Sequence, residues 1–234
     1  MNIINPYRFG GAFNGFGNNS RDFDGTDDYI SIANFDTTLD SSFTIAFWLK
    51  LDDGQPATNN QLFGVDIGSD IARILVTTGG VVRGVYKSNG NTSVADLDTS
   101  LANGQQGWVH YAWVVTPTEQ KIYVDGSDAT LDATNDGDMT GIPMGVFSTS
   151  LSFYVGARNL NGSADEYTAG NYADFRIYDA DIGATEIANL AAGTDYQTNL
   201  VGWWLDDDDD VLDNAGSNDG TNNGSTYSTD GPAD

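Results

Sequence analysis

The stretch SFTIAFWLKL, residues 42–51, decides the fold predicted for this chain. Apolar side chains occupy every second position from Phe43 to Leu51, and the positions between them carry Thr44, Ala46, Trp48 and Lys50. Successive side chains of a β-strand point to opposite faces of the sheet, so this two-residue period is that of a half-buried strand. We therefore expect one face of this strand to belong to the core.

The same period recurs from residue 22 onward and is interrupted by turns rich in Gly, Asn and Asp. Two turns, Gly79-Gly80 and Asp125-Gly126, suit the positive φ angles of tight hairpins, so neighbouring strands should be antiparallel. The expected strands cover residues 28–33, 43–51, 61–67, 71–77, 81–87, 108–116, 120–125, 152–157, 172–178 and 200–205.

One segment, GATEIANL at residues 183–190, has the pattern of a helix. Glu186 is placed to cap its first turn and Gly193 to end it. Regularly spaced strands with a single short helix specify an all-β antiparallel sandwich or jelly roll. The 234 residues suit one such domain, because β-sandwiches extend to roughly 200–250 residues.

The composition excludes several classes of protein. The chain has 34 acidic and 9 basic residues and a net charge of −25, so nucleic acid and anionic membrane surfaces are poor partners. It has no cysteine, which excludes disulfides, thiolate metal sites and cysteine nucleophiles. All but three of the acids are aspartate, a residue that favours turns and caps over helices.

Residues 1–20 form an N-terminal segment rich in Gly and Asn, with aromatic side chains spaced along it at Tyr7, Phe9, Phe13 and Phe16. The segment is either a flexible arm or an arm that docks on a partner, since four exposed rings are unfavourable in water. It lacks the basic start and apolar stretch of a secretory signal, and no run approaches the ~18 apolar residues of a membrane helix. We expect residues 21–234 to form a single soluble domain.

Five segments of the chain occur in an order that identifies a family: DFDGTDDYISI (22–32), SFTIAFWLKL (42–51), GWVHYAWVVTPTEQKIYVDG (107–126), FYVGARN (153–159) and YADFRIYDADIGATEIANL (172–190). Together they resemble the laminin-G-like, concanavalin A-like jelly-roll modules of bacterial, phage and secreted proteins. The resemblance covers about residues 20–195. Its most specific signals are Trp108 followed by YVDG (123–126), and RIY (176–178) followed by Glu186-Ile187.

The C-terminal residues 200–221, LVGWWLDDDDDVLDNAGSNDGT, depart from this family pattern. They resemble the apolar-aromatic strand, acidic loop and Gly-Thr turn that commonly open such a domain. A circular permutation, a truncated second module and a segment donated to a neighbouring subunit are the three explanations. A piece of this size buries too little surface to fold alone, whereas the termini of a domain often lie close together. We expect residues 200–234 to complete the same sandwich in cis.

The sequence argues against catalysis. Glycoside hydrolases of this fold use two carboxylic acids that face each other across the sugar. The only glutamates fall in a turn, a loop and a helix start, and alternating aspartates such as Asp22 and Asp24, or those at 206, 208 and 210, are typical of solvated charge. His110, the only histidine, lies in an expected strand with no serine elbow beside it. The three glutamates are Glu119, Glu166 and Glu186. We expect no enzymatic activity.

Calcium is the cofactor that the chain could hold, because Asp-rich turns supply the oxygen ligands that it prefers. The resemblance implies a structural calcium near the chain ends or at the loop rim, although the same carboxylates could simply cap turns. The candidate ligands are Asp27, Asp28, Asp174, Asp213 and Asp219.

A sugar site in such a sandwich would combine aromatic rings with Asn or Asp groups at a loop rim. Candidates are Asn159, Asn161, Tyr167 and Asn171, although loops of this composition also occur without any ligand.

Two functions remain open. The first is a non-enzymatic phage structural protein, a capsid decoration (cement) or tail-associated subunit. It would be made in the host cytoplasm and displayed on the virion surface, and its N-terminal arm would contact the major capsid or tail protein. The second is a carbohydrate-binding or adhesion module that recognises surface glycans, with an extracellular location. The arm and the displaced C-terminal strand also predict a homo-oligomer.

Overall fold

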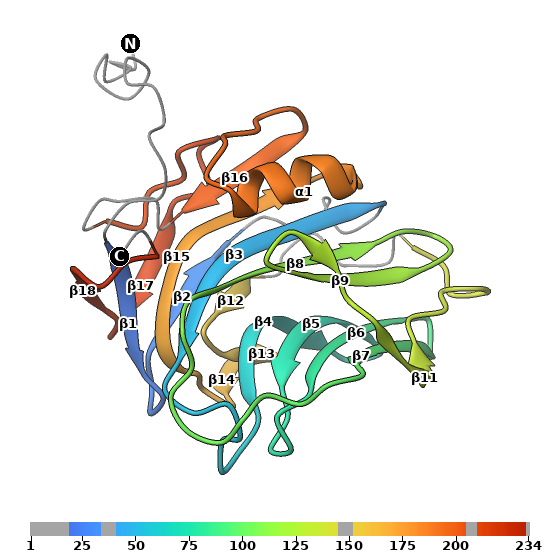
Figure 1. The fold of residues 1–234 in the computed structure, drawn as a ribbon, viewed down its shortest axis with the longest axis horizontal. Helices are drawn as coiled ribbons and strands as arrows, with labels where there is room; N and C mark the ends of the chain where they lie inside the picture. Colours follow the sequence, from blue (N-terminus) through green and yellow to red (C-terminus); the bar gives the residue numbers. More distant parts are fainter. Residues whose placement is uncertain (1–18, 34–40, 145–151, 205–209, 233–234) are drawn as a thin grey trace.

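The computed structural model describes residues 19–33, 41–144, 152–204 and 210–232, which form two β-sheets packed face to face (Figure 1). We call the two sheets sheet A and sheet B. The predicted all-β antiparallel sandwich with one short helix is confirmed. In the described residues no helix is long and apolar enough to cross a membrane.

Sheet A has eight strands, in the order β10-β9-β8-β3-β15-β1-β18, and β16 pairs with β15 beside this path. All of its neighbouring strands are antiparallel. The bounds are β1 Ser20–Asp24, β3 Phe43–Leu51, β8 Val109–Val115, β9 Gln120–Val124, β10 Ser127–Asp128, β15 Ala169–Tyr178, β16 Leu200–Trp204 and β18 Thr226–Ser228.

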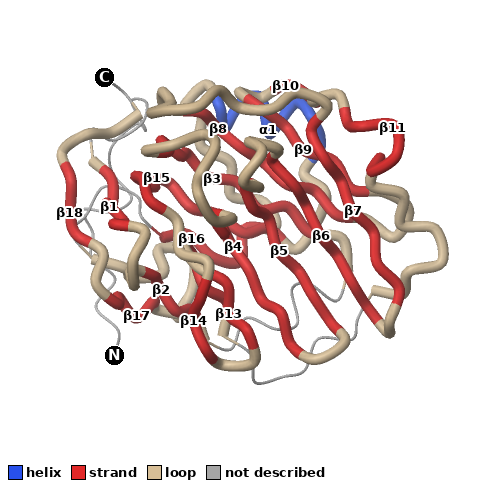
Figure 2. The backbone as a smooth tube through the Cα atoms, turned by 90° about the horizontal axis from the view of Figure 1, so that it is seen from below, coloured by secondary structure: helices blue, strands red, loops and turns tan. Residues whose placement is uncertain are grey.

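Sheet B has ten strands, and Figure 2 looks onto it from its outer side. The order is β11-β7-β6-β5-β4-β12-β2-β17, with the β13–β14 hairpin joined to β4 through a parallel pairing with β13. The bounds are β2 Tyr29–Ile32, β4 Asn60–Ile67, β5 Asp70–Val76, β6 Val82–Ser88, β7 Asn91–Leu97, β11 Leu131–Asp136, β12 Phe153–Val155, β13 Arg158–Leu160, β14 Ser163–Asp165 and β17 Gly220–Asn223.

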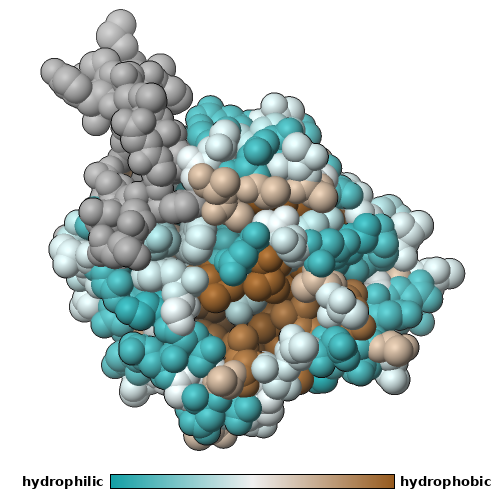
Figure 3. Space-filling view, viewed as in Figure 1, coloured by the Kyte–Doolittle hydropathy of each residue, from teal (hydrophilic) through white to brown (hydrophobic). Residues whose placement is uncertain are grey.

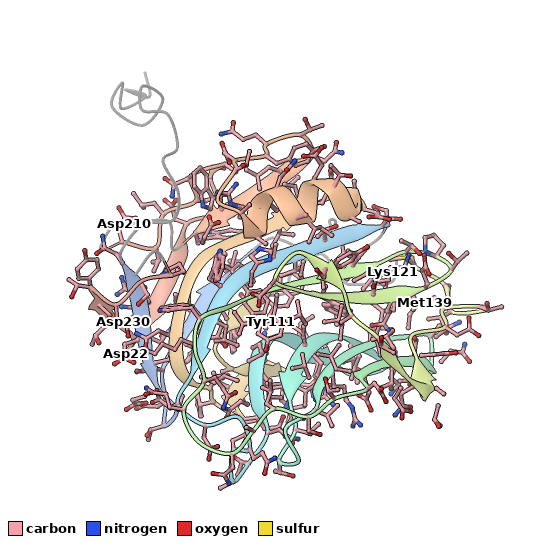
Figure 4. The ribbon with its side chains drawn as sticks, viewed as in Figure 1. Asp22, Tyr111, Lys121, Met139, Asp210 and Asp230 are labelled. Atoms are coloured by element: carbon pink, nitrogen blue, oxygen red, sulfur yellow. The ribbon has the colours of Figure 1, made fainter. Side chains whose placement is uncertain are left out.

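The core between the sheets is rich in aromatic rings. Phe47 of β3 stacks on Phe175 of β15, with 5.5 Å between ring centroids, and Phe175 lies 5.6 Å from Phe63 of β4 in the opposite sheet. Phe63 in turn stacks on Phe153 of β12 at 5.3 Å. In Figure 3 apolar residues come to the surface in a hollow between the sheets, in the region where Figure 4 labels Tyr111.

The predicted core face of β3 is confirmed, and most of its opposite face is buried too. The predicted core positions are buried, but Thr44 and Ala46 on the opposite face are buried as well. Helix α1, Gly183–Ala191, lies across this outer face of sheet A (Figure 1) and places Ile187 and Leu190 in a second apolar cluster with Ala46. Strand alternation reveals which side chains share a face, but it does not show what covers that face.

The helix has the predicted position, but its N-terminal cap differs from the prediction. Glu186 makes no capping hydrogen bond and instead accepts one from Asn189 Nδ2 at 3.1 Å. Asp181 Oδ1 accepts the backbone N–H of Gly183 at 2.8 Å. Gly193, with φ of +76°, ends the helix as predicted, because this left-handed conformation suits glycine.

The turn predictions are partly confirmed. Asp125 and Gly126 both have positive φ in the hairpin between β9 and β10. In the connection between β5 and β6 the positive φ falls on Gly80, and Gly79 does not share it.

All ten predicted strands are present, with ends shifted by up to three residues; residue 205 lies outside the described residues. Eight strands were not predicted: β1, β7, β10, β11, β13, β14, β17 and β18. Most of these are short and polar, so they lack the apolar alternation on which the prediction depends.

The C-terminal segment contributes strands to both sheets of its own chain. β16 pairs with β15, β17 with β2 of sheet B, and β18 with β1 of sheet A. Buried Arg21 of β1 donates to both the hydroxyl and the carbonyl of Ser225, and Lys50 of β3 forms an ion pair with Asp230 at 2.5 Å. The first strand of the segment also buries Trp204 in the main core.

The arm expected at residues 1–20 falls almost wholly outside the described residues, and β1 already begins at Ser20.

We expect Trp204→Ala to lower the free energy of unfolding by about 3–5 kcal/mol, because it opens a cavity where a side chain 1% exposed was packed. Thermal unfolding should show the melting temperature falling by roughly 10 °C. Leu212→Ala, at a side chain 40% exposed, is the control and should leave the melting temperature nearly unchanged. Equal melting temperatures for Trp204→Ala and wild type would mean that β16 does not complete this core.

Candidate functional site

Three tyrosines gather at the β2–β12 end of sheet B. Tyr154 of β12 and Tyr29 of β2 lie 4.5 Å apart between ring centroids, and Tyr167 lies 6.4 Å from Tyr29. On β12 the flanking Phe153 and Val155 belong to the core, so alternation turns Tyr154 to the outer face of the sheet. We call these three residues the tyrosine cluster.

The rings of the tyrosine cluster differ in exposure. Tyr154 is 7% exposed, whereas Tyr29 and Tyr167 are partly exposed. The hydroxyl of Tyr167 donates to the carbonyl of Ala164 at 3.0 Å, which fixes this ring against the end of the β13–β14 hairpin. The rings of Tyr29 and Tyr167 are therefore accessible to a ligand, and the ring of Tyr154 packs against Tyr29.

An acidic cluster adjoins Tyr29 in the turn between β1 and β2. Asp24, Asp27 and Asp28 each place a carboxylate oxygen so that all three lie within 4.8 Å of one another. The backbone N–H of Asp24 donates to Asp28 Oδ2 at 2.9 Å, and that of Thr26 donates to Asp24 Oδ1 at 2.7 Å. Because β1 belongs to sheet A and β2 to sheet B, this acidic cluster lies at the rim where the chain crosses between the sheets.

Burial and mutual repulsion perturb this rim. Burial raises the pKa of Asp28, and the neighbouring charges of Asp24 and Asp27 raise it further, against a lowering by the hydrogen bond from the Asp24 backbone. Burial, together with the charges of Asp52, Asp28 and Asp24, raises the pKa of Asp22, which Figure 4 labels on the same side of the molecule as Asp230. Burial and neighbouring negative charge therefore both disfavour the ionised forms of Asp22 and Asp28 at this rim.

The acidic cluster fits the requirements of a calcium ion. Calcium binds oxygen ligands at 2.3–2.6 Å, so two oxygens on one ion lie at most about 5 Å apart. The spacing of the Asp24, Asp27 and Asp28 carboxylates is within this limit. A bound cation would also relieve the repulsion that raises the pKa of Asp28. Among the described residues this is the one group of three or more acidic or histidine side chains close enough to share an ion.

The structure brings together two of the five predicted calcium ligands, Asp27 and Asp28, and adds Asp24. Asp174 lies at a bulge of β15, where its Oδ1 accepts hydrogen bonds from Arg176 Nε and Trp203 Nε1, both at 2.8 Å. This carboxylate is engaged by protein donors and lies apart from the acidic cluster.

The other two predicted ligands order the C-terminal loop. Asp213 accepts the backbone N–H groups of Trp203, Ala215 and Asn218. Asp219 Oδ1 accepts the backbone N–H of Asp213 at 3.0 Å. Here the alternative of turn capping describes what these carboxylates do.

Of the predicted sugar-site residues, Tyr167 belongs to the tyrosine cluster and the three asparagines do not. Asn159 is buried and holds the β13–β14 turn through Ser152 and Gly162. Asn161 accepts the backbone N–H of Gly68, and Asn171 is buried against Ser20. Tyr29 and Tyr154 were missed; the alternation in YISI and FYV marks both as outward-facing, but it does not show that β2 and β12 are neighbours.

The residues considered for catalysis have other surroundings. His110 is buried beside Trp48, with 5.4 Å between ring centroids, and burial together with the charge of Arg176 lowers its pKa to about 3. Glu119 pairs with Lys121 at 2.9 Å. Glu166 accepts from Gln61 Nε2 at 2.6 Å, in the neighbourhood of the tyrosine cluster.

Two curved sheets with aromatic and acidic groups at one rim define a lectin-like β-sandwich. The sequence profile of the concanavalin A-like lectin/glucanases superfamily, of laminin-G type, matches residues 24–188. The chain belongs to this family. The matched range ends before β16, so the C-terminal strands lie outside it. No curated protein sequence matches the chain.

Solved structures similar to the chain share its fold at low sequence identity. A candidate carbohydrate-binding protein from Bacteroides ovatus has a TM-score of 0.63 at 17% identity, covering 92% of this chain and 60% of its own. The chain thus spans under two thirds of that protein. The CBM40 module of an IT-sialidase from Ruminococcus gnavus has a TM-score of 0.53 at 11% identity, covering 77% and 100%. The SAP-like pentraxin of Limulus polyphemus has a TM-score of 0.51 at 14% identity, covering 74% and 81%.

We predict that calcium raises the melting temperature at neutral pH, by about 5–10 °C at a concentration one hundred times its dissociation constant. The rise should shrink as the pH falls, because the raised pKa of Asp28 lets protons compete with the ion at a higher pH than for an ordinary aspartate. Without calcium, Asp28 should instead make the protein more stable as the pH falls. Its pKa is higher in the folded state than in the unfolded state, so the folded state binds the proton more tightly.

The matched variants for this test are Asp27→Asn, which should abolish the calcium-dependent rise, and Asp98→Asn, an exposed aspartate outside the cluster, which should keep it. An unchanged melting temperature of the wild-type protein in calcium and in chelator at neutral pH would contradict the assignment.

Proposed function

We propose that this protein is a non-enzymatic carbohydrate-binding module and that the tyrosine cluster, with the acidic cluster beside it, is the binding site. The observation that carries the proposal is the grouping of partly exposed Tyr29 and Tyr167 next to three carboxylates on one rim. Sugars offer an apolar ring face and a polar edge, and aromatic rings beside hydrogen-bonding groups complement both.

The similar structures support a glycan as the ligand. The proteins from Bacteroides ovatus and Ruminococcus gnavus are described by their carbohydrate binding, and both have the sandwich fold. This similarity favours the glycan-binding alternative over the virion subunit, which rests only on the sequence argument above. An extracellular glycan is the ligand that we propose.

The surroundings of the acidic residues support binding without catalysis. A glycoside hydrolase needs one carboxylic acid held protonated and a second placed across the scissile bond. Asp28 and Asp24 are joined through a backbone hydrogen bond within one tight turn, so they do not face each other across a sugar-sized gap. His110 is buried under the outer face of sheet A and has a lowered pKa of about 3, which makes it a poor general base for a surface substrate.

Calcium bound at the acidic cluster would help to bind the sugar. When bound, the ion supplies positive charge that sugar hydroxyls and their lone pairs can approach. The chain's own contribution is to hold Asp24, Asp27 and Asp28 together through the tight turn at Gly25, whose φ is +73°, and to place Tyr29 directly after them.

The proposal predicts selective binding on a glycan array and loss of binding when the cluster is altered. Tyr167→Ala should weaken binding of the best glycan about tenfold, because it removes one stacking surface. Tyr227→Ala is the matched control: this tyrosine is 39% exposed on β18, away from the cluster, and its loss should leave the affinity unchanged.

Calorimetric titration of each variant measures the effect, and product analysis after long incubation should find the glycan intact. An array on which the wild-type protein binds nothing would overturn the proposed function. Cleavage of the bound glycan would overturn its non-enzymatic part.

A further inference from the structure

Next to the tyrosine cluster, sheet B carries a group of polar side chains that the proposed site does not yet use. Tyr154 of β12 pairs with Gly64 of β4, and Gly64 pairs with Arg73 of β5. A register shift between Gln61 and Phe63 places an extra residue in β4, so that Gln61 and Gly64 both turn to the outer face. Arg73, Gln61 and Gly64 therefore continue the surface that Tyr154 begins.

Gly64 lies next to both Arg73 and Gln61. A Cβ atom at this position would lie 2.9 Å from Arg73 Cβ and 3.4 Å from Gln61 Oε1, so a side chain here would crowd both residues. No other residue could stand here without displacing Arg73. Gly64 thus leaves open space beside the base of the Arg73 side chain and the amide oxygen of Gln61.

Arg73 and Gln61 have polar atoms without hydrogen-bond partners among the described residues. Arg73 Nε and Nη1 and Gln61 Oε1 are buried and make no hydrogen bond. The amide orientation of Gln61 is fixed, because its Nε2 donates to the Glu166 carboxylate at 2.6 Å and only a donor can do so. Two donors and one acceptor thus make no hydrogen bond in this part of sheet B, which is unfavourable for buried polar atoms.

Two neighbouring arginines on sheet B have carboxylate hydrogen-bond partners, which Arg73 lacks. Arg83 binds Asp96 through two hydrogen bonds of 2.6 and 2.7 Å, and Arg158 binds Asp165 through two of 2.8 and 2.6 Å. Arg73 has only an ion pair with Asp66, whose Oδ2 lies 3.6 Å from Nη1, beyond hydrogen-bond distance. No bidentate partner holds its guanidinium in place.

We propose that Arg73 and Gln61 form a second part of the glycan site and bind hydroxyl groups of a neutral sugar unit next to the one on the tyrosine cluster. This inference rests on the proposed function and extends it to the chemical class and length of the ligand. A sugar hydroxyl accepts a hydrogen bond from Arg73 and donates one to Gln61 Oε1, with a small rotation of the Arg73 side chain to admit it.

The chemistry favours a hydroxyl over an anion. A hydroxyl is both donor and acceptor, so it satisfies Arg73 and Gln61 together, whereas a carboxylate or sulfate has only acceptors and leaves Gln61 Oε1 unpaired. The charges nearby agree: Arg73 and Arg158 are outnumbered by Asp66, Asp165 and Glu166, whose ion pairs surround the position. An anionic glycan would meet net negative charge here and on the chain as a whole.

The sheet geometry gives the direction of the ligand. Neighbouring strands lie about 4.8 Å apart, so Arg73, Gly64 and Tyr154 follow one another across β5, β4 and β12 over roughly 10 Å. The ring of Tyr29 on β2 lies 4.5 Å from that of Tyr154. A chain of linked sugars laid across these strands reaches both the rings and the guanidinium. A single sugar does not.

The test is a length series of the neutral glycan selected on the array, measured by calorimetric titration from the disaccharide upward. Affinity should rise with length for the wild-type protein, and Arg73→Met should remove that rise, about tenfold for the longer glycans, while leaving the disaccharide unchanged. Arg83→Met is the matched control, since Arg83 is already paired with Asp96 on the next strand, and it should behave as wild type. Tyr167→Ala should instead weaken all lengths alike.

Thermal unfolding excludes a purely structural role. Arg73→Met should not lower the melting temperature, because it removes buried donors that make no hydrogen bond, and Asp66 keeps its ion pair with Arg158. Two results would overturn this inference and leave the proposed function standing. One is an affinity of Arg73→Met that rises with glycan length as it does for the wild-type protein. The other is a preference of the wild-type protein for carboxylated or sulfated glycans over neutral ones. Failure of the wild-type protein to bind any glycan overturns both.

Discussion

The stacking of Phe47 on Phe175 in the middle of sheet A is the contact on which the rest of the molecule depends. It joins the two central strands β3 and β15 and continues through Phe63 to Phe153 in sheet B. This line of rings fixes how the two sheets face each other. Because Phe153 anchors β12 from the inside, Tyr154 must turn outward, so the core sets the position of the candidate site.

The excess of acid is distributed in three ways. Many aspartates hold backbone N–H groups in turns, as Asp213 does for the C-terminal loop. Others pair with the few arginines, and Asp24, Asp27 and Asp28 are left crowded at one rim. Among the residues that the structure describes, this last group alone has three carboxylates close enough to share an ion. Electrostatic repulsion there is the physical reason to expect a metal ion, and the same rim carries the tyrosines.

The two outer faces of the sandwich differ in what covers them. Helix α1 covers part of the outer face of sheet A, so apolar residues such as Ala46 are buried there, on the side opposite the predicted core face. No helix of the described residues covers sheet B, and its outer face carries the tyrosine cluster and the buried polar atoms of Arg73 and Gln61. The helix-covered face of sheet A adds to the core, whereas the outer face of sheet B is where we propose that the ligand binds.

The sequence alone determined the fold class, ten of the strands, the helix and the family, because these follow from local alternation, turn chemistry and short motifs. It also marked Asp27, Asp28 and Tyr167 as site residues. It could not show that Asp24 joins them, that Asp174 is engaged by Arg176 and Trp203, or that Tyr29 and Tyr154 meet. Those facts depend on which strands become neighbours. Strand order is set by the packing of distant segments into one core, and only the tertiary structure decides it.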